Sequence, residues 1–190
     1  MKKTVVISLI KEKVSEYYDR YIDIFDRRTI EVFQTKQSVI DFMLDRANKE
    51  SSYRHEDKDG KVLTVSGSSA RGLYQIKKPA ESDVIRLSEI DGISALNIDE
   101  NIFIAFYYIF IVIPEFFNDY YKEFNKSNFT VAYTRGWKYC TDIQTSETEP
   151  ANAGPVSEVS KRSAVVKILA IILFVTVVVG MVSYTWRKLK

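Results

Sequence analysis

The chain has 190 residues, of which 46% are hydrophobic and 13% are aromatic, and its formal net charge is +2. This length and composition suffice for one domain with a hydrophobic core plus an appendage, and they exclude a disordered chain. The near-neutral charge argues against a basic nucleic-acid-binding surface, so we expect no nucleic-acid partner, and the single cysteine, Cys140, excludes an intrachain disulfide.

The first 35 residues are predicted to form an N-terminal helical extension. A short apolar run, 4–10, follows two lysines, but no small-residue cleavage site comes after it. We therefore expect this run to belong to the folded protein rather than to a signal peptide. Residues 11–33 mix apolar and charged side chains and are expected to be helical.

Residues 38–53 have the apolar spacing of a helix, with Val39, Met43 and Ala47 in one stripe. Glu50 continues this stripe at its C-terminal end. A carboxylate at the edge of an apolar face loses hydration, which raises its pKa, and a general acid near neutral pH needs a raised pKa. The alternative is that Glu50 lies exposed and inert in a frayed last turn.

Residues 54–65 contain Asp59-Gly60, a hairpin-type turn, and predict a small β-hairpin beside a cleft. His55 stands in this segment among three acidic residues. One imidazole in a charged loop is more typical of a solvated surface patch than of a metal site. The sequence therefore predicts no metal and no other cofactor.

After residue 65, the spacing of apolar residues and the positions of Gly and Pro predict four further helices. The apolar run 102–113 is too short to cross a bilayer and ends at Pro114, so it is expected to be a buried central helix. The expected segments are a helix from Ser69 onward with Gly72 in its first turn, a helix from Pro79 over 80–88, the buried helix 101–114, and a last helix over 128–139.

The C-terminal residues, 141–190, are predicted to form a flexible tether followed by a membrane anchor. Residues 141–163 are rich in Thr, Ser, Pro and Glu and are predicted to be a flexible linker. Residues 164–186 are long and apolar enough for a single transmembrane helix, with Tyr184 and Trp186 at the far end. A basic tail, 187–190, follows. The alternative, a buried core helix, fits less well because the run is apolar all round.

Four short motifs occur in one order along residues 36–140. They are Glu50-Ser51 at a helix end, the segment SGSSARGLYQI at 66–76, Asn101-Ile102 with Ala105 and Tyr108-Ile109, and AYTRG at 132–136. Together they resemble the soluble lytic transglycosylases, whose fold is similar to goose-type lysozyme. Ser69, Tyr74 and Thr134 depart from the family pattern, which has Gly, Met and Asn there.

The resemblance implies a mainly α fold of the α+β lysozyme-like kind over residues 36–140. It also implies cleavage of the β-1,4 bond between N-acetylmuramic acid and N-acetylglucosamine in peptidoglycan. Glu50 would protonate the glycosidic oxygen and then accept the proton of the muramic C6 hydroxyl, which gives a 1,6-anhydro product. One carboxyl group would thus act first as an acid and then as a base.

The resemblance also assigns substrate-binding residues. Gln75 matches a glutamine that contacts sugar, and Tyr133 matches a tyrosine whose hydroxyl reaches the catalytic carboxyl. Ser51 and Ser66 match polar positions near the glutamate, and Tyr74 could stack on a sugar face. The structural alternatives are helix caps for the serines, a surface position for Gln75 and core positions for the tyrosines.

Two other functions stay open. Asp57 or Asp59 could supply a second carboxylate, which would make the protein a two-carboxylate muramidase. The protein could instead be a non-catalytic structural or peptidoglycan-binding protein with the same fold.

The expected partners are peptidoglycan glycan strands, a lipid membrane through residues 164–186, and other virion membrane proteins. Both flanks of the predicted span are basic, so charge leaves the orientation open. Tailless phages with an internal membrane carry transglycosylases that open the wall during genome delivery. By this analogy we expect a virion internal membrane, with the bacterial inner membrane as the alternative.

Overall fold

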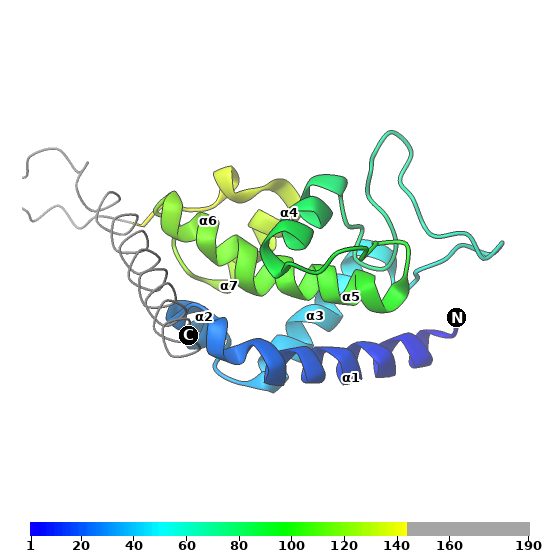
Figure 1. Ribbon diagram of the computed structural model, residues 1–190, viewed down its shortest axis with the longest axis horizontal. Coiled ribbons are helices and arrows are strands. Elements are labelled where there is room, and N and C mark those ends of the chain that lie inside the picture. The colour runs from blue at the N-terminus through cyan, green and yellow to red at the C-terminus, as the bar shows by residue number, and fades with distance from the viewer. Residues whose placement is uncertain (144–190) are drawn as a thin grey trace, which may run out of the picture. The chain divides into compact units, whose positions relative to one another are not determined.

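Helices make up most of residues 1–143, the part of the chain that the computed structural model describes (Figure 1). The predicted membrane helix, the basic tail and the predicted linker from residue 144 onward lie outside the described residues, whereas residues 141–143 of that linker are hydrogen-bonded to the folded unit. The elements are α1 (Lys3–Tyr21), η1 (Ile22–Ile24), α2 (Arg27–Phe33), α3 (Lys36–Ser51), α4 (Lys78–Ser88), α5 (Ile98–Tyr107), η2 (Tyr108–Val112), α6 (Ile113–Asp119), α7 (Lys126–Arg135) and η3 (Trp137–Tyr139).

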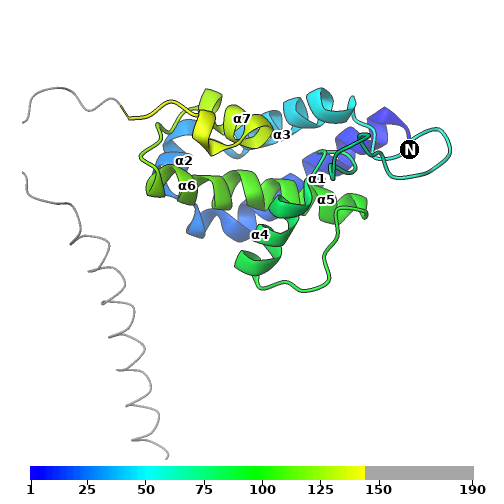
Figure 2. The ribbon, with the colours of Figure 1, turned by 90° about the horizontal axis from the view of Figure 1, so that it is seen from above.

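The centre of the fold is one continuous rod, Ile98–Asp119, formed by α5, η2 and α6. In Figure 2 it crosses the middle of the unit, with α3 and α7 on one side and α4 on the other. Its η2 turn is π-helical. The rod is long and apolar enough to cross a bilayer, but most of its surface is buried inside the unit. The predicted buried central helix is therefore confirmed, and it begins at Ile98 rather than Asn101.

The N-terminal helices pack into the same core. Val6, Ile10 and Val14 lie one helical turn apart on α1 and are buried against α3 and α5. Phe33 of α2 contacts Phe110 edge-on, with ring centroids 5.0 Å apart. Residues 1–144 thus form one unit with a hydrophobic core of its own, which allows this unit to be studied alone.

Side chains cap four helix starts. Each accepts a hydrogen bond from a backbone N–H of the first turn, which satisfies a donor that the helix cannot pair. The caps are Asp26 for α2, Thr35 for α3, Asn97 for α5 and Asn125 for α7. Pro79 stands in the first turn of α4, as its sequence position predicts.

The prediction of a helix from Ser69 onward is wrong. Residues 66–77 form turns, and Gly72 and Gln75 have φ values of 70° and 50°, which a right-handed helix does not allow. Arg71 and Ile76 instead exchange two backbone hydrogen bonds of 3.0 Å each, which closes a tight loop between them. The last helix also ends early, at Arg135, because Gly136 takes a φ of 102°.

The predicted β-hairpin is reduced to a turn. One oxygen of Asp57 accepts hydrogen bonds from the backbone N–H groups of Asp59 and Lys61, at 2.8 and 3.0 Å. A single antiparallel bridge joins Glu56 to Val62. Residues 1–143 contain no extended strand. The mainly α prediction is confirmed for these residues, whereas a lysozyme-like fold remains a prediction.

His55 is not on a solvated surface, as its charged neighbours suggested, but is buried with 5% of its surface exposed. Its Nδ1 accepts the backbone N–H of Leu73 at 3.2 Å, and its Nε2 lies 2.9 Å from the carbonyl oxygen of Leu96. Because Nδ1 is an acceptor, the ring proton belongs on Nε2, which donates to Leu96. The imidazole thus ties the loop at Leu73 to the segment before α5.

Asn101 of α5 holds the same loop from the other side. This side chain is fully buried, and its Oδ1 accepts the backbone N–H of Tyr74 at 2.9 Å. Its Nδ2 donates to the carbonyl oxygens of Arg71 and Ala95, at 3.1 and 2.8 Å. Every polar atom of the amide is used, so this network specifies one loop conformation.

We expect Gly72→Ala to destabilise residues 1–144 by at least about 3 kcal/mol, because overpacking is added to an unfavourable backbone conformation. A Cβ atom at this position would lie 2.6 Å from Asn101 Nδ2 and 2.7 Å from His55 Cε1. The matched control is Gly67→Ala, with a similar φ of 75° and nothing within 4 Å of the added atom. It should cost only about 1–2 kcal/mol. Urea unfolding of both variants measures the difference, and equal losses would contradict the packing of the loop.

Candidate active site

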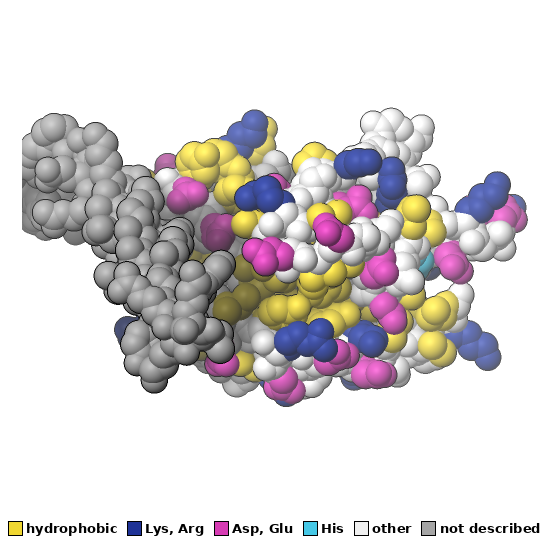
Figure 3. Space-filling model, viewed as in Figure 1, with side chains coloured by type: hydrophobic (Ala, Val, Ile, Leu, Met, Phe, Trp, Pro, Cys, Tyr) yellow, Lys and Arg dark blue, Asp and Glu magenta, His cyan; other side chains and the backbone are white. Residues whose placement is uncertain are grey.

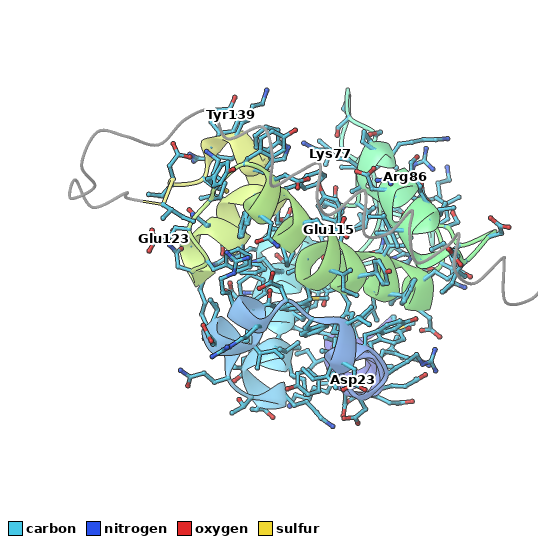
Figure 4. All side chains as sticks on the ribbon, turned by 60° about the vertical axis from the view of Figure 1, so that its left-hand side comes forward. Asp23, Lys77, Arg86, Glu115, Glu123 and Tyr139 are labelled. Atoms are coloured by element: carbon cyan, nitrogen blue, oxygen red, sulfur yellow. The ribbon has the colours of Figure 1, made fainter. Side chains whose placement is uncertain are left out.

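An open pocket of about 440 Å³ lies where α3 and α7 end and α4 begins. In Figure 4, Lys77 at this pocket lies between α4, which carries Arg86, and the yellow-green C-terminal helices. The lining residues come from four segments of the chain: Glu50, then Val65, Ser68, Ala70, Gln75, Ile76, Lys77, Pro79 and Ala80, then Tyr108, then Ala132, Tyr133, Thr134, Arg135 and Gly136.

Glu50 lines this pocket from the last turn of α3 and is partly buried. Loss of hydration raises the pKa of its carboxyl group, while the positive charges of Arg46 and Lys77 oppose the rise. No other carboxylate is among the lining residues that the structure describes. The apolar stripe predicted a partly buried Glu50 with a raised pKa, and both parts of this prediction are confirmed. The alternative, an exposed Glu50 in a frayed last turn, is wrong.

Gln75 lies in the same pocket, as predicted. Its Nε2 donates to the carbonyl oxygen of Gly72 at 2.7 Å, which fixes the amide. Its Oε1 is buried and has no hydrogen-bond partner among the described residues. Because an unpaired buried acceptor is costly, a rotation of this side chain that brings Oε1 to a hydrogen-bond donor in the pocket would be favourable.

Tyr133 lines the pocket from α7, but its hydroxyl does not bond the carboxyl group of Glu50. It donates to the backbone carbonyl of Tyr74. Burial, with a smaller contribution from the negative charge of Glu50, holds the pKa of Tyr133 well above its usual value. Tyr133 therefore stays protonated and anchors the loop, and it contributes a ring face to the pocket wall.

Tyr108 also lines the pocket. It belongs to the motif that begins at Asn101, but no role was predicted for it. It comes from the π-helical turn, and its ring lies edge-on to that of Tyr133, with centroids 6.4 Å apart. A π turn shifts the register of a helix and is frequent at functional sites. A regular helical pattern gives no signal for such a shift, so the place of Tyr108 could not be predicted.

Three predicted binding residues lie outside the pocket lining. Tyr74 cannot stack on a sugar, because its side chain is fully buried and its hydroxyl donates to the carbonyl oxygen of Met43 at 3.1 Å. Ser51 is buried at the end of α3, where its hydroxyl donates to the carbonyl oxygen of Ala47 and accepts from the backbone N–H of Arg54, at 3.1 Å each, which fits the helix-cap alternative. Ser66 is exposed in a turn, and its neighbour Ser68 lines the pocket instead.

Asp57 and Asp59 are also outside the pocket lining. The carboxylate of Asp57 stabilises the turn described above, and neither residue shares the pocket with Glu50. In residues 1–143 no group of three His, Cys, Asp or Glu side chains is arranged to hold a metal ion.

Comparisons with known proteins add no relative: no protein-family model, no curated protein and no solved structure matches this chain.

We expect Glu50→Gln to raise the free energy of unfolding of residues 1–144 at pH 7. Because burial raises the pKa of Glu50 in the folded state, wild-type stability falls as the pH rises through that pKa. Glutamine keeps the size without the charge, so the gain should vanish below the ordinary glutamate pKa of about 4.3. Urea unfolding at both pH values measures this, with the exposed Glu12→Gln as the control. No gain at pH 7 would contradict the buried position of the carboxylate.

Proposed function

We propose that this protein is a membrane-anchored peptidoglycan lytic transglycosylase of the lysozyme-like kind. The observation that carries the proposal is one partly buried carboxyl group, Glu50, with a raised pKa in an open pocket. A general acid needs this combination of access and raised pKa. The four motifs add support, since each of them supplies at least one lining residue, and the motif that supplies Tyr108 also supplies the buried amide of Asn101.

In the proposed reaction, protonated Glu50 donates its proton to the glycosidic oxygen as the bond from this oxygen to C1 of N-acetylmuramic acid breaks. The C6 hydroxyl of the same sugar attacks C1, and the Glu50 carboxylate accepts the proton of that hydroxyl. The products are a 1,6-anhydro end and a free C4 hydroxyl, with no water consumed. Glu50 finishes protonated, ready for the next cycle.

The surrounding residues fit both halves of this cycle. Burial favours the protonated acid before cleavage, whereas the charges of Arg46 and Lys77 stabilise the carboxylate after the proton has left. Gln75 lines the pocket, and rotation of its side chain would bring the unpaired Oε1 to a sugar hydroxyl or an acetamido N–H. The rings of Tyr108 and Tyr133 supply an apolar wall for a sugar face.

A two-carboxylate muramidase is less well supported, because Glu50 is the single carboxylate among the described lining residues. The proposed setting of the enzyme is a lipid membrane, held through residues 164–186. A virion internal membrane is the first candidate and the bacterial inner membrane is the second. The task would be local opening of the cell wall during genome delivery, beside other virion membrane proteins.

Digestion of purified peptidoglycan tests this function. Wild-type protein should release anhydro-muropeptides, identified by mass spectrometry. Glu50→Gln should lower the rate by at least about 100-fold, because general acid and base catalysis contributes that much or more. Glu12→Gln should digest at the wild-type rate.

Two results would contradict the proposal. Muropeptides with reducing ends would show hydrolysis instead of anhydro-ring formation. No products from a folded wild-type protein that still binds peptidoglycan would leave the non-catalytic wall-binding alternative.

A further inference from the structure

A second feature, outside the pocket lining, is a group of mostly exposed aromatic and apolar side chains near the end of the described chain. We call it the aromatic patch, and it consists of Tyr120, Tyr121, Trp137, Tyr139 and Ile143. The exposed fractions of the outer side chains are 47% for Tyr120, 67% for Tyr121, 64% for Tyr139 and 45% for Ile143. Figure 3 shows apolar side chains gathered at the upper left, over α6 and the segment after α7. In Figure 4, Tyr139 stands at the edge of the unit.

The patch is ordered by its own packing. The rings of Tyr120 and Trp137 are stacked, with centroids 3.7 Å apart and planes inclined by 13°. Phe116 of α6 supports Trp137 from inside, at 6.3 Å. None of the five patch residues lines the pocket around Glu50. The stacked pair is thus held in place, and the more exposed rings of Tyr121 and Tyr139 lie beside it in sequence, which gives a group of apolar side chains open to water, as interaction surfaces often have.

The chain leaves the folded unit through this patch. The backbone N–H of Ile143 donates to the carbonyl oxygen of Tyr121 at 2.9 Å, and Glu123 N–H donates to Thr141 at 2.9 Å. An ion pair between Lys122 and Asp142 holds the same two segments together. The predicted linker therefore starts beside Tyr121.

The length of that linker limits how far the patch can lie from a membrane. Residues 144–163 separate the patch from the predicted span at 164–186. About twenty residues reach roughly 70 Å when fully extended, and about 25 Å on average when flexible. The patch includes Ile143, the last described residue, so fewer residues separate it from the predicted span than separate any other part of the described unit from that span.

The chemistry of the patch fits a lipid interface. Tyrosine and tryptophan rings, apolar with one polar atom, favour the boundary between headgroups and acyl chains. The exposed charges nearest in sequence are mixed, with the acidic Asp119, Glu123 and Asp142 and the basic Arg135 and Lys138. Such a surface is not a basic patch for anionic headgroups. Binding through inserted rings would not depend on salt.

We propose that the aromatic patch docks on the lipid interface next to the membrane anchor and thereby fixes the direction in which the pocket faces. This inference rests on the proposed anchor at 164–186 and not on catalysis. A docked patch holds α6 and η3 against the bilayer. The pocket at the ends of α3 and α7 then keeps one orientation toward the wall.

The two tryptophans of the chain, Trp137 and Trp186, make this testable in the full-length protein. Trp186→Phe leaves Trp137 as the single fluorescent tryptophan. This variant is reconstituted in phosphatidylcholine vesicles with and without bromine on the upper acyl chains. Insertion to the headgroup boundary should quench Trp137 fluorescence by about twofold or more, and about 0.5 M NaCl should not reverse the quenching.

A double variant in the same background replaces Tyr121 and Tyr139 with serine, which removes the two most exposed rings of the patch and keeps Tyr120 stacked on Trp137. We expect it to lose the quenching while still floating with the vesicles. The matched control replaces two exposed side chains elsewhere, Ile24→Ser and Ile30→Ser. It should be quenched like the parent protein.

Several results would overturn the inference. Trp137 could remain unquenched in protein that floats with the vesicles, or the protein could fail to float, which would remove the anchor itself. Quenching that salt reverses, or a Trp137 response to soluble peptidoglycan fragments instead of lipid, would assign the patch to another ligand. Peptidoglycan digestion by the same Trp186→Phe protein is measured separately. Loss of quenching with retained activity would reject the docking of the patch but not the proposed enzyme. Quenching without activity would reject the proposed enzyme but not the docking.

Discussion

The buried side chain of Asn101 is the constraint on which the rest of the site depends. It bonds Tyr74 and Arg71 of the loop and Ala95 before α5, and no polar atom of its amide is left over. With His55 on the other side, it fixes a loop that has no regular secondary structure of its own. This loop forms one wall of the pocket around Glu50. A change in the buried hydrogen bonds of Asn101 or His55 would therefore also change the geometry around the carboxyl group of Glu50.

The apolar core sets the chemistry of Glu50 in a second way. The rod at the centre is apolar along most of its length, and the faces of α1, α3 and α7 are buried against it. The apolar stripe of α3, through Val39 and Met43, packs into the core, and Glu50 lies at the end of this stripe, beside the pocket. Its carboxyl group has therefore lost part of its hydration. The same packing that stabilises the fold thus raises the pKa of the one lining carboxylate among the described residues.

Sequence reasoning succeeded where one periodic pattern decides the structure. The stripe through Val39 and Met43 predicted both the helix and the half-buried position of Glu50, and the run 102–113 predicted the buried rod. It failed in the loop, because the positive φ values of Gly72 and Gln75 are imposed by hydrogen bonds from residues distant in sequence. The burial of His55 and Tyr74 follows from the same contacts, which no local pattern encodes. The π turn at Tyr108 escaped prediction for a related reason, since core packing rather than spacing sets it.

A crystal structure of residues 1–144 carrying Glu50→Gln, soaked with a peptidoglycan tetrasaccharide, would test the central claim most directly. The account predicts glycan in the pocket, with a glycosidic oxygen within about 2.6–3.2 Å of the substituted amide at position 50, as a general acid requires. It also predicts a sugar donor on Gln75 Oε1. Glycan bound elsewhere, or in the pocket but out of reach of that amide, would contradict the claim that Glu50 is the catalytic acid.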